Sequence, residues 1–333
     1  MRRRIVLSGY GIFLGVKGER FVIKRSGEVL REVPAFEVSQ VLVDTKGATI
    51  SSAAMRLLLR YGVELLVLRG GKLLGKLSPA RRGANIHLRM TQYSIRDSER
   101  GLELAKSFVM GKLRNQADLL KSLAKNREGD ERRRLKEAAR QIEALMWTVG
   151  EITGSPEVLR GRAMGIEAEA GRIYWSAIAS ILPRELGFTT RRQRYDRPED
   201  PFNVTLNYLY TVLMSEAWFA LESVGLEPYL GFLHVPNNRR PALAVDFMEE
   251  FRQPVVDRAV LSLVREMGDF LEEGKLKPEA RKKALKAYEE RMNTLITFRG
   301  RRHKVRGHLR LQAERLASAV MGRLAYEPFR VRW

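Results

Sequence analysis

Strand-like and helix-like patterns divide the chain into two parts. The first 78 residues alternate apolar and polar positions between glycine-containing turns, as half-buried strands do. The pattern is clearest in the runs IVLSGYGIFLGV, RFVIKRSGEVLREV and VSQVLVDTKG. One helix follows in SSAAMRLLLRYG, with Ser51 or Ser52 as its N-cap and Gly62 as its C-cap. Next, VELLVL and KLLGKL flank an RGG turn as a hairpin. Residues 1–78 are therefore predicted to form a small β-rich domain.

Helical spacing begins after a short linker. Residues 79–89 contain Pro79, Gly83 and three arginines without any periodicity, and we predict that they form the linker. From about residue 90 the apolar positions recur at helical spacing almost to the end. The predicted helices span residues 90–123, 130–148, 156–181, 202–224, 243–267 and 277–298. The helix over residues 243–267 is expected to be kinked or broken at Pro254. The expected fold is α+β: a small β-rich N-terminal domain followed by a larger, all-α-helical domain over residues 90–333.

Composition narrows the possible partners. The formal net charge of +21 favours binding to polyanions, with nucleic acid first and an anionic membrane surface as the alternative. No run of apolar residues approaches the roughly 18 to 20 that a membrane helix needs, and Gly9, Gly11 and Lys17 interrupt any signal-peptide core. We expect a soluble, cytoplasmic protein that is not bound to a membrane. The lack of cysteine excludes disulfides, thiolate zinc sites and cysteine nucleophiles.

An unusual cluster of acids follows a histidine in GFLHVPNNRRPALAVDFMEEFRQPVVD. This segment contains His234 and then Asp246, Glu249, Glu250 and Asp257. On a helix, the first three acids lie at i, i+3 and i+4 and share one face, and the neighbouring Phe and Met residues place that helix in or near the core. Buried carboxylates need partners, because an ionised group is costly to bury alone. Those partners are either arginines or a metal ion.

A further acid comes from GIEAEAGRIYW. Glu167 and Glu169 are two residues apart, so they point to nearly opposite sides of a helix. Glu167 shares its face with Ala170, Gly171 and Tyr174, which predicts that it points inward and that Glu169 faces solvent. Two carboxylates and an imidazole without a thiolate favour Mg²⁺ or Mn²⁺. In a basic protein such a site suits phosphodiester chemistry. The alternative, that the acids only pair with nearby arginines, stays open.

Two groups of arginines are candidate DNA contacts. The segment TTRRQRYDRP surrounds Tyr195 with arginines, and basic residues beside an aromatic ring suit phosphates and an unstacked base. The alternative is a solvated, arginine-rich loop. The second group accompanies the acidic segment. Together the candidates are Arg191, Arg192, Arg194, Arg239, Arg240 and Arg252.

Several blocks of the chain, in this order, resemble the CRISPR-associated Cas-one family of endonucleases and integrases. They are GIEAEAGRIYW, DPFNVTLNYLYTVL, GLEPYLGFLHVPNNRRPALAVDFMEEFRQPVVD and QAERLASAVMGRLAYEPF. The runs GYGIFLGVKGERFVIKRSGEVLREVP and MRLLLRYGVELLVL look like the family's N-terminal β-domain. The resemblance covers nearly the whole chain. It implies that the helical domain is the catalytic domain and that a homodimer forms largely through the N-terminal domains.

The resemblance also implies which residues form the site. Matched by motif, Glu167, His234 and Glu249 are the catalytic residues and the ligands of Mg²⁺ or Mn²⁺, and Asp246 is a supporting acid. Two departures are mild: Ala168 stands where the family commonly has Gly, and Glu249 occupies a position that is Asp in some members.

Three polar residues are candidates for a supporting shell around those ligands. Asn203, Asn207 and Tyr210 lie at i, i+4 and i+7 on one face of a predicted helix. The spacing alone also allows them to bridge or cap within the core. The resemblance favours a supporting role at the site.

The implied activity is metal-dependent cleavage of DNA and, with a small Cas-two partner, insertion of short fragments (spacers) into a repeat array. A 3′-hydroxyl of the incoming fragment attacks a phosphodiester of the repeat. Double-stranded and branched DNA are the implied substrates. Two alternatives remain: a general DNA repair or recombination nuclease, and a non-catalytic nucleic-acid-binding scaffold.

Overall fold

The computed structural model describes residues 3–69, 72–77, 79, 85–196, 198–236 and 240–331. The chain divides into two compact units, Met1–Arg82 and Gly83–Trp333. The division falls inside the segment predicted as a linker. No helix of the described residues is long and apolar enough to cross a membrane.

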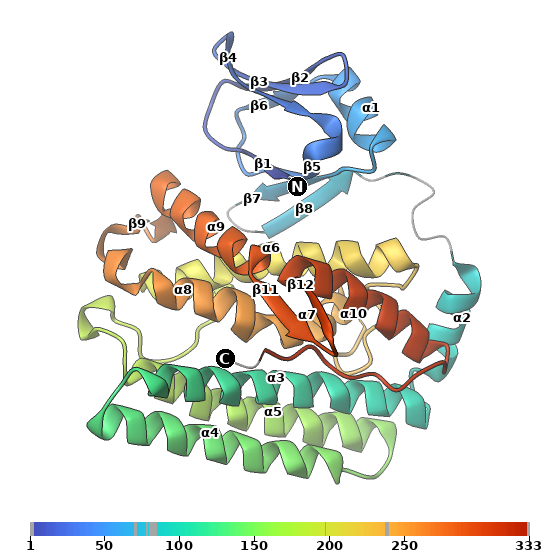
Figure 1. The fold of residues 1–333 in the computed structure, drawn as a ribbon, viewed down its shortest axis with the longest axis vertical. Coiled ribbons are helices and arrows are strands. Elements are labelled where there is room, and N and C mark those ends of the chain that lie inside the picture. The colour runs from blue at the N-terminus through green and yellow to red at the C-terminus, as the bar shows by residue number, and fades with distance from the viewer. Residues whose placement is uncertain are drawn as a thin grey trace. The chain divides into compact units, whose positions relative to one another are not determined.

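The N-terminal unit is built from strands, as the period-2 pattern predicts (Figure 1). Over the described residues they form two four-stranded sheets, with orders β1-β5-β7-β8 and β4-β3-β2-β6. In the first sheet β1, β5 and β7 are parallel, and β8 pairs antiparallel with β7 as the predicted hairpin. The strands are β1 (Arg3–Leu7), β2 (Ile12–Lys17), β3 (Arg20–Arg25), β4 (Glu28–Pro34), β5 (Val38–Val43), β6 (Ala48–Ile50), β7 (Glu64–Arg69) and β8 (Lys72–Leu77).

The helix of this unit begins at a predicted cap and ends one residue before the predicted C-cap, with Tyr61 in that position. Helix α1 (Ser52–Arg60) has Ser51 as its N-cap, whose side chain accepts the N–H of Ala54 at 3.1 Å. Gly62 follows the helix with a φ of +64°, in the left-handed region that favours glycine. The apolar side chains of the helix pack with those of the strands into one core.

The C-terminal unit is mainly helical and has its own core. Figure 1 shows α3, α4 and α5 running alongside one another, and each of these helices contacts the other two. Its helices are α2 (Ile86–Ile95), α3 (Glu99–Lys125), α4 (Gly129–Gly150), α5 (Pro156–Ala179), α6 (Pro201–Val224), α7 (Ala242–Phe251), α8 (Arg258–Ser262), α9 (Pro278–Asn293) and α10 (Val305–Val320). Short 3₁₀ turns occur at Arg184–Leu186, Arg194–Asp196 and Val264–Asp269.

The predicted helix over residues 90–123 is wrong as one element. Helix α2 begins at Ile86 and ends at Ile95, and α3 begins at Glu99. The chain turns sharply between them, so a Cβ atom on Gly101 would lie 2.2 Å from the carbonyl oxygen of Ile95. A glycine is therefore needed where α3 starts.

Two other predicted helices differ from the structure at their ends. The helix over residues 243–267 continues from α7 into a π-helical segment (Arg252–Asp257) that contains Pro254, and then into α8. Proline lacks the N–H that a regular helix needs, so the predicted kink or break is replaced by a change to π-helical geometry at Pro254. The helix over residues 277–298 ends at Asn293, where a hairpin begins. The unit is thus not purely helical, since it contains the hairpins β9–β10 (Leu271–Glu272, Lys275–Leu276) and β11–β12 (Leu295–Phe298, Arg301–Lys304).

Candidate active site

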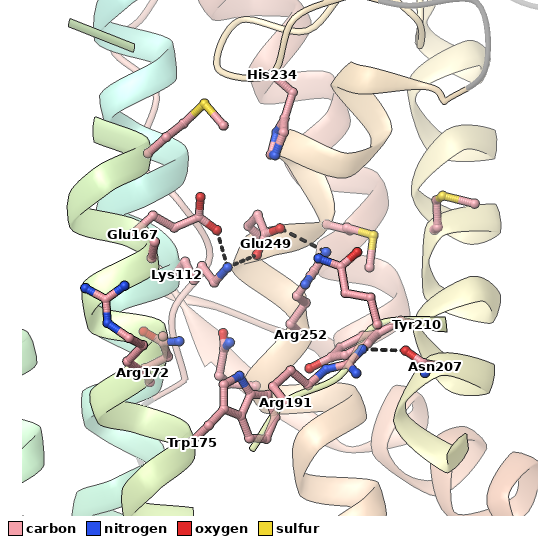
Figure 2. Close-up of a pocket in the computed structure, with 18 of the residues that line it drawn as sticks. Lys112, Glu167, Arg172, Trp175, Arg191, Asn207, Tyr210, His234, Glu249 and Arg252 are labelled. Carbon is pink, nitrogen blue, oxygen red and sulfur yellow. Dashed lines mark hydrogen bonds and ion pairs between the residues drawn. The ribbon is translucent and has the colours of Figure 1, made fainter. Parts of the chain in front are cut away.

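A cavity of about 630 Å³ in the C-terminal unit brings together several of the predicted site residues. Helices α3, α5, α6 and α7 line it, together with Thr190, Arg191, Gln193 and Tyr195 in the segment before α6. Glu167, His234 and Glu249 all face this cavity (Figure 2). They come from positions as much as 82 residues apart, so only the tertiary fold brings them together.

The central helix α7 carries the acids, and every one of its residues is buried. A helix that is buried on all sides leaves its acids no access to water. Each acid on α7 therefore needs a partner, because an unpaired buried charge is costly. The structure separates them. Glu249 lines the cavity, and Asp246 contacts His234, which also lines it. Glu250 instead accepts hydrogen bonds from Tyr326 and the backbone N–H of Phe329 in the C-terminal segment. Glu250 therefore stabilises the C-terminal segment and does not line the cavity.

Glu167 on α5 and Glu249 on α7 are joined by a third side chain. The ammonium group of Lys112, on α3, forms an ion pair with Oε1 of Glu167 and lies 2.9 Å from Oε2 of Glu249 (Figure 2). Oε1 of Glu249 pairs with Arg252 at 3.0 Å. Burial alone would raise the pKa of Glu249, but the charges of Arg252 and Lys112 lower it overall. Burial would likewise lower the pKa of Lys112, but Glu167 and Glu249 raise it. The neighbouring charges therefore favour the charged forms of both Glu249 and Lys112.

His234 is held by Asp246. Nδ1 of His234 lies 2.6 Å from Oδ1 of Asp246, and this buried carboxylate also accepts the backbone N–H groups of Phe232, Leu233 and His234. The loop wraps so closely that a Cβ atom on Gly231 would lie 2.9 Å from Oδ2 of Asp246. With Nδ1 engaged, Nε2 remains for the cavity, and Figure 2 shows the ring directed toward Glu249. Burial opposes protonation, but the hydrogen bond and charge of Asp246 raise the pKa of His234 overall.

The donor set fits a hard divalent cation in its chemistry. Oε2 of Glu249 is buried, and its contact is the Lys112 ammonium at 2.9 Å. A carboxylate behind a histidine is the usual second contact of a ligating imidazole, and Asp246 supplies it here. Two carboxylates and an imidazole suit Mg²⁺ or Mn²⁺. Within the described ranges, no three His, Asp or Glu side chains converge as a ligand set, and Lys112 stands between the two carboxylates.

The predicted supporting residues contact arginines rather than the three candidate ligands. Asn203 accepts hydrogen bonds from Arg191 Nη1 at 3.0 Å and from the backbone N–H of Arg192 at 2.9 Å. Asn207 accepts one from Arg191 Nη2 at 2.6 Å. Two guanidinium groups lie over the ring of Tyr210. That of Arg191 is 5.3 Å from the ring centroid, and that of Arg252 is 4.7 Å from it. These residues fix the cations that line the cavity.

The hydroxyl of Tyr210 is itself held by a buried carboxylate. Asp257, which is buried, accepts hydrogen bonds from the hydroxyls of Tyr174 and Tyr210. Asp257 therefore belongs to the support of the cavity and does not line it.

The candidate DNA-binding arginines fall into three groups. Arg191, Arg240 and Arg252 line the cavity together with the exposed ring of Tyr195. Arg192 is exposed beside them. For the remaining two, the backbone of Arg194 lies in a 3₁₀ turn but its side chain is outside the described part, and Arg239 lies outside the described residues altogether.

Sequence reasoning missed Lys112, which lines the cavity and pairs with Glu167 and Glu249. A signal was present. Lys112 lies four residues after Phe108 and seven before Leu119, so it occupies the core-facing stripe of α3. Gln116 lies one turn further on the same stripe and also lines the cavity. Polar residues on an apolar stripe are informative because they must have partners.

Comparisons with known proteins agree on one family. A family model described as "CRISPR associated protein Cas1" matches residues 5–290. A protein of Archaeoglobus fulgidus named "CRISPR-associated endonuclease Cas1 1" is 35% identical over 348 residues, which covers 99% of this chain and 100% of the relative. A protein of the same name from Thermus thermophilus is 35% identical over 338 residues, covering 97% and 98%.

Solved structures show the same fold. A chain described as "Casposase bound to integration product" matches with a TM-score of 0.81 and 24% identity over 98% of this chain and 93% of its own. A Cas1 protein from Thermotoga maritima matches with a TM-score of 0.77 and 20% identity over 98% and 100%. A chain of a "Cas6-RT-Cas1--Cas2 complex" has a TM-score of 0.77 and 21% identity over 98% of this chain and 36% of its own. The predicted α+β fold and the predicted family resemblance are confirmed.

Proposed function

The chain belongs to the CRISPR-associated Cas1 family, and from that premise we propose that it is a metal-dependent DNA endonuclease and integrase of CRISPR adaptation. Relatives named as Cas1 endonucleases along nearly its whole length support the endonuclease and integrase role. The observation that carries the chemistry is the pair Glu167 and Glu249. These two carboxylates come from different helices and share one cation, the Lys112 ammonium, in a cavity lined by arginines.

The proposed reaction needs no covalent intermediate with the protein. The 3′-hydroxyl oxygen of an incoming strand attacks a phosphorus of the repeat, the new P–O bond forms, and the bond to the repeat's own 3′-oxygen breaks. That oxygen leaves with a proton as a free 3′-hydroxyl. When bound by Glu167, His234 and Glu249, Mg²⁺ or Mn²⁺ would neutralise a non-bridging phosphate oxygen and favour loss of the attacking hydroxyl's proton.

The residues of this chain contribute positioning and charge. Asp246 fixes the imidazole of His234 through Nδ1. Arg191, Arg240 and Arg252 present positive charge along the cavity, where DNA phosphates would bind. The side chain of Arg252 also pairs with Glu249, so it connects these three arginines to the carboxylates.

The proposed partners are double-stranded and branched DNA, a second copy of the chain, and a small Cas2 protein. The formal net charge of +21 supports DNA binding. A structural neighbour described as a Cas1–Cas2 assembly, and another described as bound to an integration product, support the choice of a Cas2 partner and of a DNA substrate. The proposed dimer contact lies in the N-terminal unit, as the family resemblance implies.

One assay separates the proposal from its alternatives. The chain is incubated with a labelled duplex fragment and a plasmid carrying a repeat array, with and without a Cas2 partner, and with Mn²⁺ or a chelator. We expect joining that needs metal, the partner and the array. A repair nuclease would instead cut branched DNA without the partner or the array. A non-catalytic scaffold would bind DNA whether or not the chelator is present, and would join nothing.

A further inference from the structure

Lys112 occupies an unusual position for a lysine. Its side chain is only 12% exposed, and its ammonium group pairs with two carboxylates that come from two other helices. Gly111 and Leu113 on either side are buried, so α3 itself is fixed in the core. The side chain reaches into the cavity from below the carboxylates, as Figure 2 shows. The cation between Glu167 and Glu249 is therefore a built feature of the fold.

The two carboxylates need a cation between them. Glu249 is 2% exposed, and the side chain of Glu167 is 15% exposed. Two ionised carboxylates this close and this buried repel each other unless a positive charge lies between them. In the structure that charge is the ammonium of Lys112. A divalent cation bound to the same oxygens would occupy the same space and repel the ammonium, so the two exclude each other.

We infer that Lys112 is an internal counter-ion that holds Glu167 and Glu249 together in the metal-free protein and is displaced into the cavity when a divalent cation binds. This inference rests on the proposed metal-dependent function. The cavity already presents Arg191, Arg240 and Arg252, so a displaced ammonium needs an anion to hold it there. A phosphate group of the bound DNA strand supplies that anion. Lys112 thus competes with the metal and, once displaced, binds DNA.

A second polar atom lies on the same stripe of α3. Oε1 of Gln116 is buried and accepts no hydrogen bond from the described residues, and Gln116 lines the cavity one turn beyond Lys112. It offers the moving ammonium an acceptor along its route. The amide is neutral, so it does not replace the charge that the two carboxylates or a phosphate provide.

Two binding measurements on the full-length protein test the inference. Lys112→Met removes the charge and keeps a similar length. Lys121→Met is the matched control, because Lys121 lies on α3 and pairs with a single acid, Glu143. Titration calorimetry with Mn²⁺ is expected to show affinity about 10- to 100-fold tighter for Lys112→Met than for the wild type, the range over which groups around metal ligands change affinity. Fluorescence anisotropy with duplex DNA in Mn²⁺ is expected to show binding roughly tenfold weaker, as the loss of one charged hydrogen bond implies. The control variant is expected to change neither.

The two effects have opposite signs, which a merely structural role would not produce. Equal or weaker Mn²⁺ affinity in Lys112→Met would overturn the inference and leave the proposed function standing. Unchanged DNA affinity in Mn²⁺ would overturn the second half of it. No Mn²⁺ binding by either protein would overturn both the inference and the metal dependence of the proposed function.

A measurement on the wild type covers the case in which Lys112→Met does not fold. Reductive methylation followed by peptide mass spectrometry compares the labelling rates of Lys112 and Lys121. The ion-paired, buried amine is expected to react slowly without metal. Its rate relative to Lys121 is expected to rise severalfold when Mg²⁺ is added, because the amine loses both carboxylate partners. A ratio that does not change with Mg²⁺ would overturn the inference.

Discussion

Nδ1 of His234 lies 2.6 Å from Oδ1 of Asp246, a carboxylate that also accepts three backbone N–H groups from the loop before α7. The acid on the helix therefore fixes the loop and the imidazole together. Which nitrogen of His234 faces the cavity is decided by this contact.

Asp246→Asn tests that relationship. The asparagine side chain has one acceptor oxygen where aspartate has two. The substitution also removes the negative charge that orients the imidazole. We expect the Mn²⁺ concentration for half-maximal DNA cleavage to rise by about 10- to 100-fold, while DNA affinity stays within about twofold. A metal titration of cleavage and an anisotropy titration without metal measure the two quantities. Reduced DNA affinity with an unchanged metal requirement would show that Asp246 acts elsewhere.

Asn203→Ala tests whether Asn203 holds Arg191 in place at the cavity. Asn203 is fully buried, accepts hydrogen bonds from Arg191 and Arg192, and donates one to the carbonyl oxygen of Thr190. Its removal takes one hydrogen-bond partner from each of these groups, which should cost about 2 kcal/mol of unfolding free energy or more. Urea unfolding measures that cost, and DNA affinity should fall at the same time. Asn207→Ala is the milder comparison, because the main contact of Asn207 is with Arg191 alone. Equal stability of Asn203→Ala and the wild type would contradict this assignment.

Arg240→Gln tests whether the cavity binds phosphates. If Arg240 contacts one phosphate, the slope of log affinity against log salt should become less steep by about 0.9 on duplex DNA. The loss should be similar for unrelated DNA sequences, because phosphates carry no base information. Anisotropy at several salt concentrations measures the slope. A loss of affinity for one sequence only, with the slope preserved, would point to base recognition instead.

Glu250 makes the stability of the fold depend on pH. Burial raises its pKa to about 7, although hydrogen bonds from Tyr326 and Phe329 oppose the shift. Because the folded pKa is above the unfolded one, Glu250 contributes fully below about pH 4.5, and that contribution is lost as the pH rises through about 7. The stability of the wild type relative to Glu250→Gln should fall by roughly 3 kcal/mol between pH 4.5 and 8. Urea unfolding of both proteins at several pH values measures it. A difference that does not change with pH would contradict the raised pKa.

Patterns within a few residues of the chain predict many of the local features of the fold. The N-cap at Ser51, the β7–β8 hairpin and the irregular turn at Pro254 follow from signals within a few residues, and the structure has all three. The orientation of Glu169 toward solvent and of Glu167 toward the cavity follows from helical periodicity. Such features depend on chain neighbours, so a single sequence contains them.

Contacts between distant residues were not accessible in the same way. The break between α2 and α3 results from the close approach of Gly101 to the carbonyl oxygen of Ile95, which helical spacing does not reveal. Lys112 meets Glu167 and Glu249 only because three helices converge. The sequence predicted that the acids needed partners, and left arginines and a metal as alternatives. The structure adds a lysine that neither alternative included.

The central claim is that Glu167 helps to hold the metal that joins DNA strands, and one pair of variants tests it most directly. Glu167→Gln removes the charge at the cavity, and Glu169→Gln makes the same change two residues away on the exposed side of α5. In a Mn²⁺-dependent strand-joining assay, we expect Glu167→Gln to lose about 100-fold or more of the rate and Glu169→Gln to match the wild type. Equal joining by Glu167→Gln and Glu169→Gln would contradict the claim.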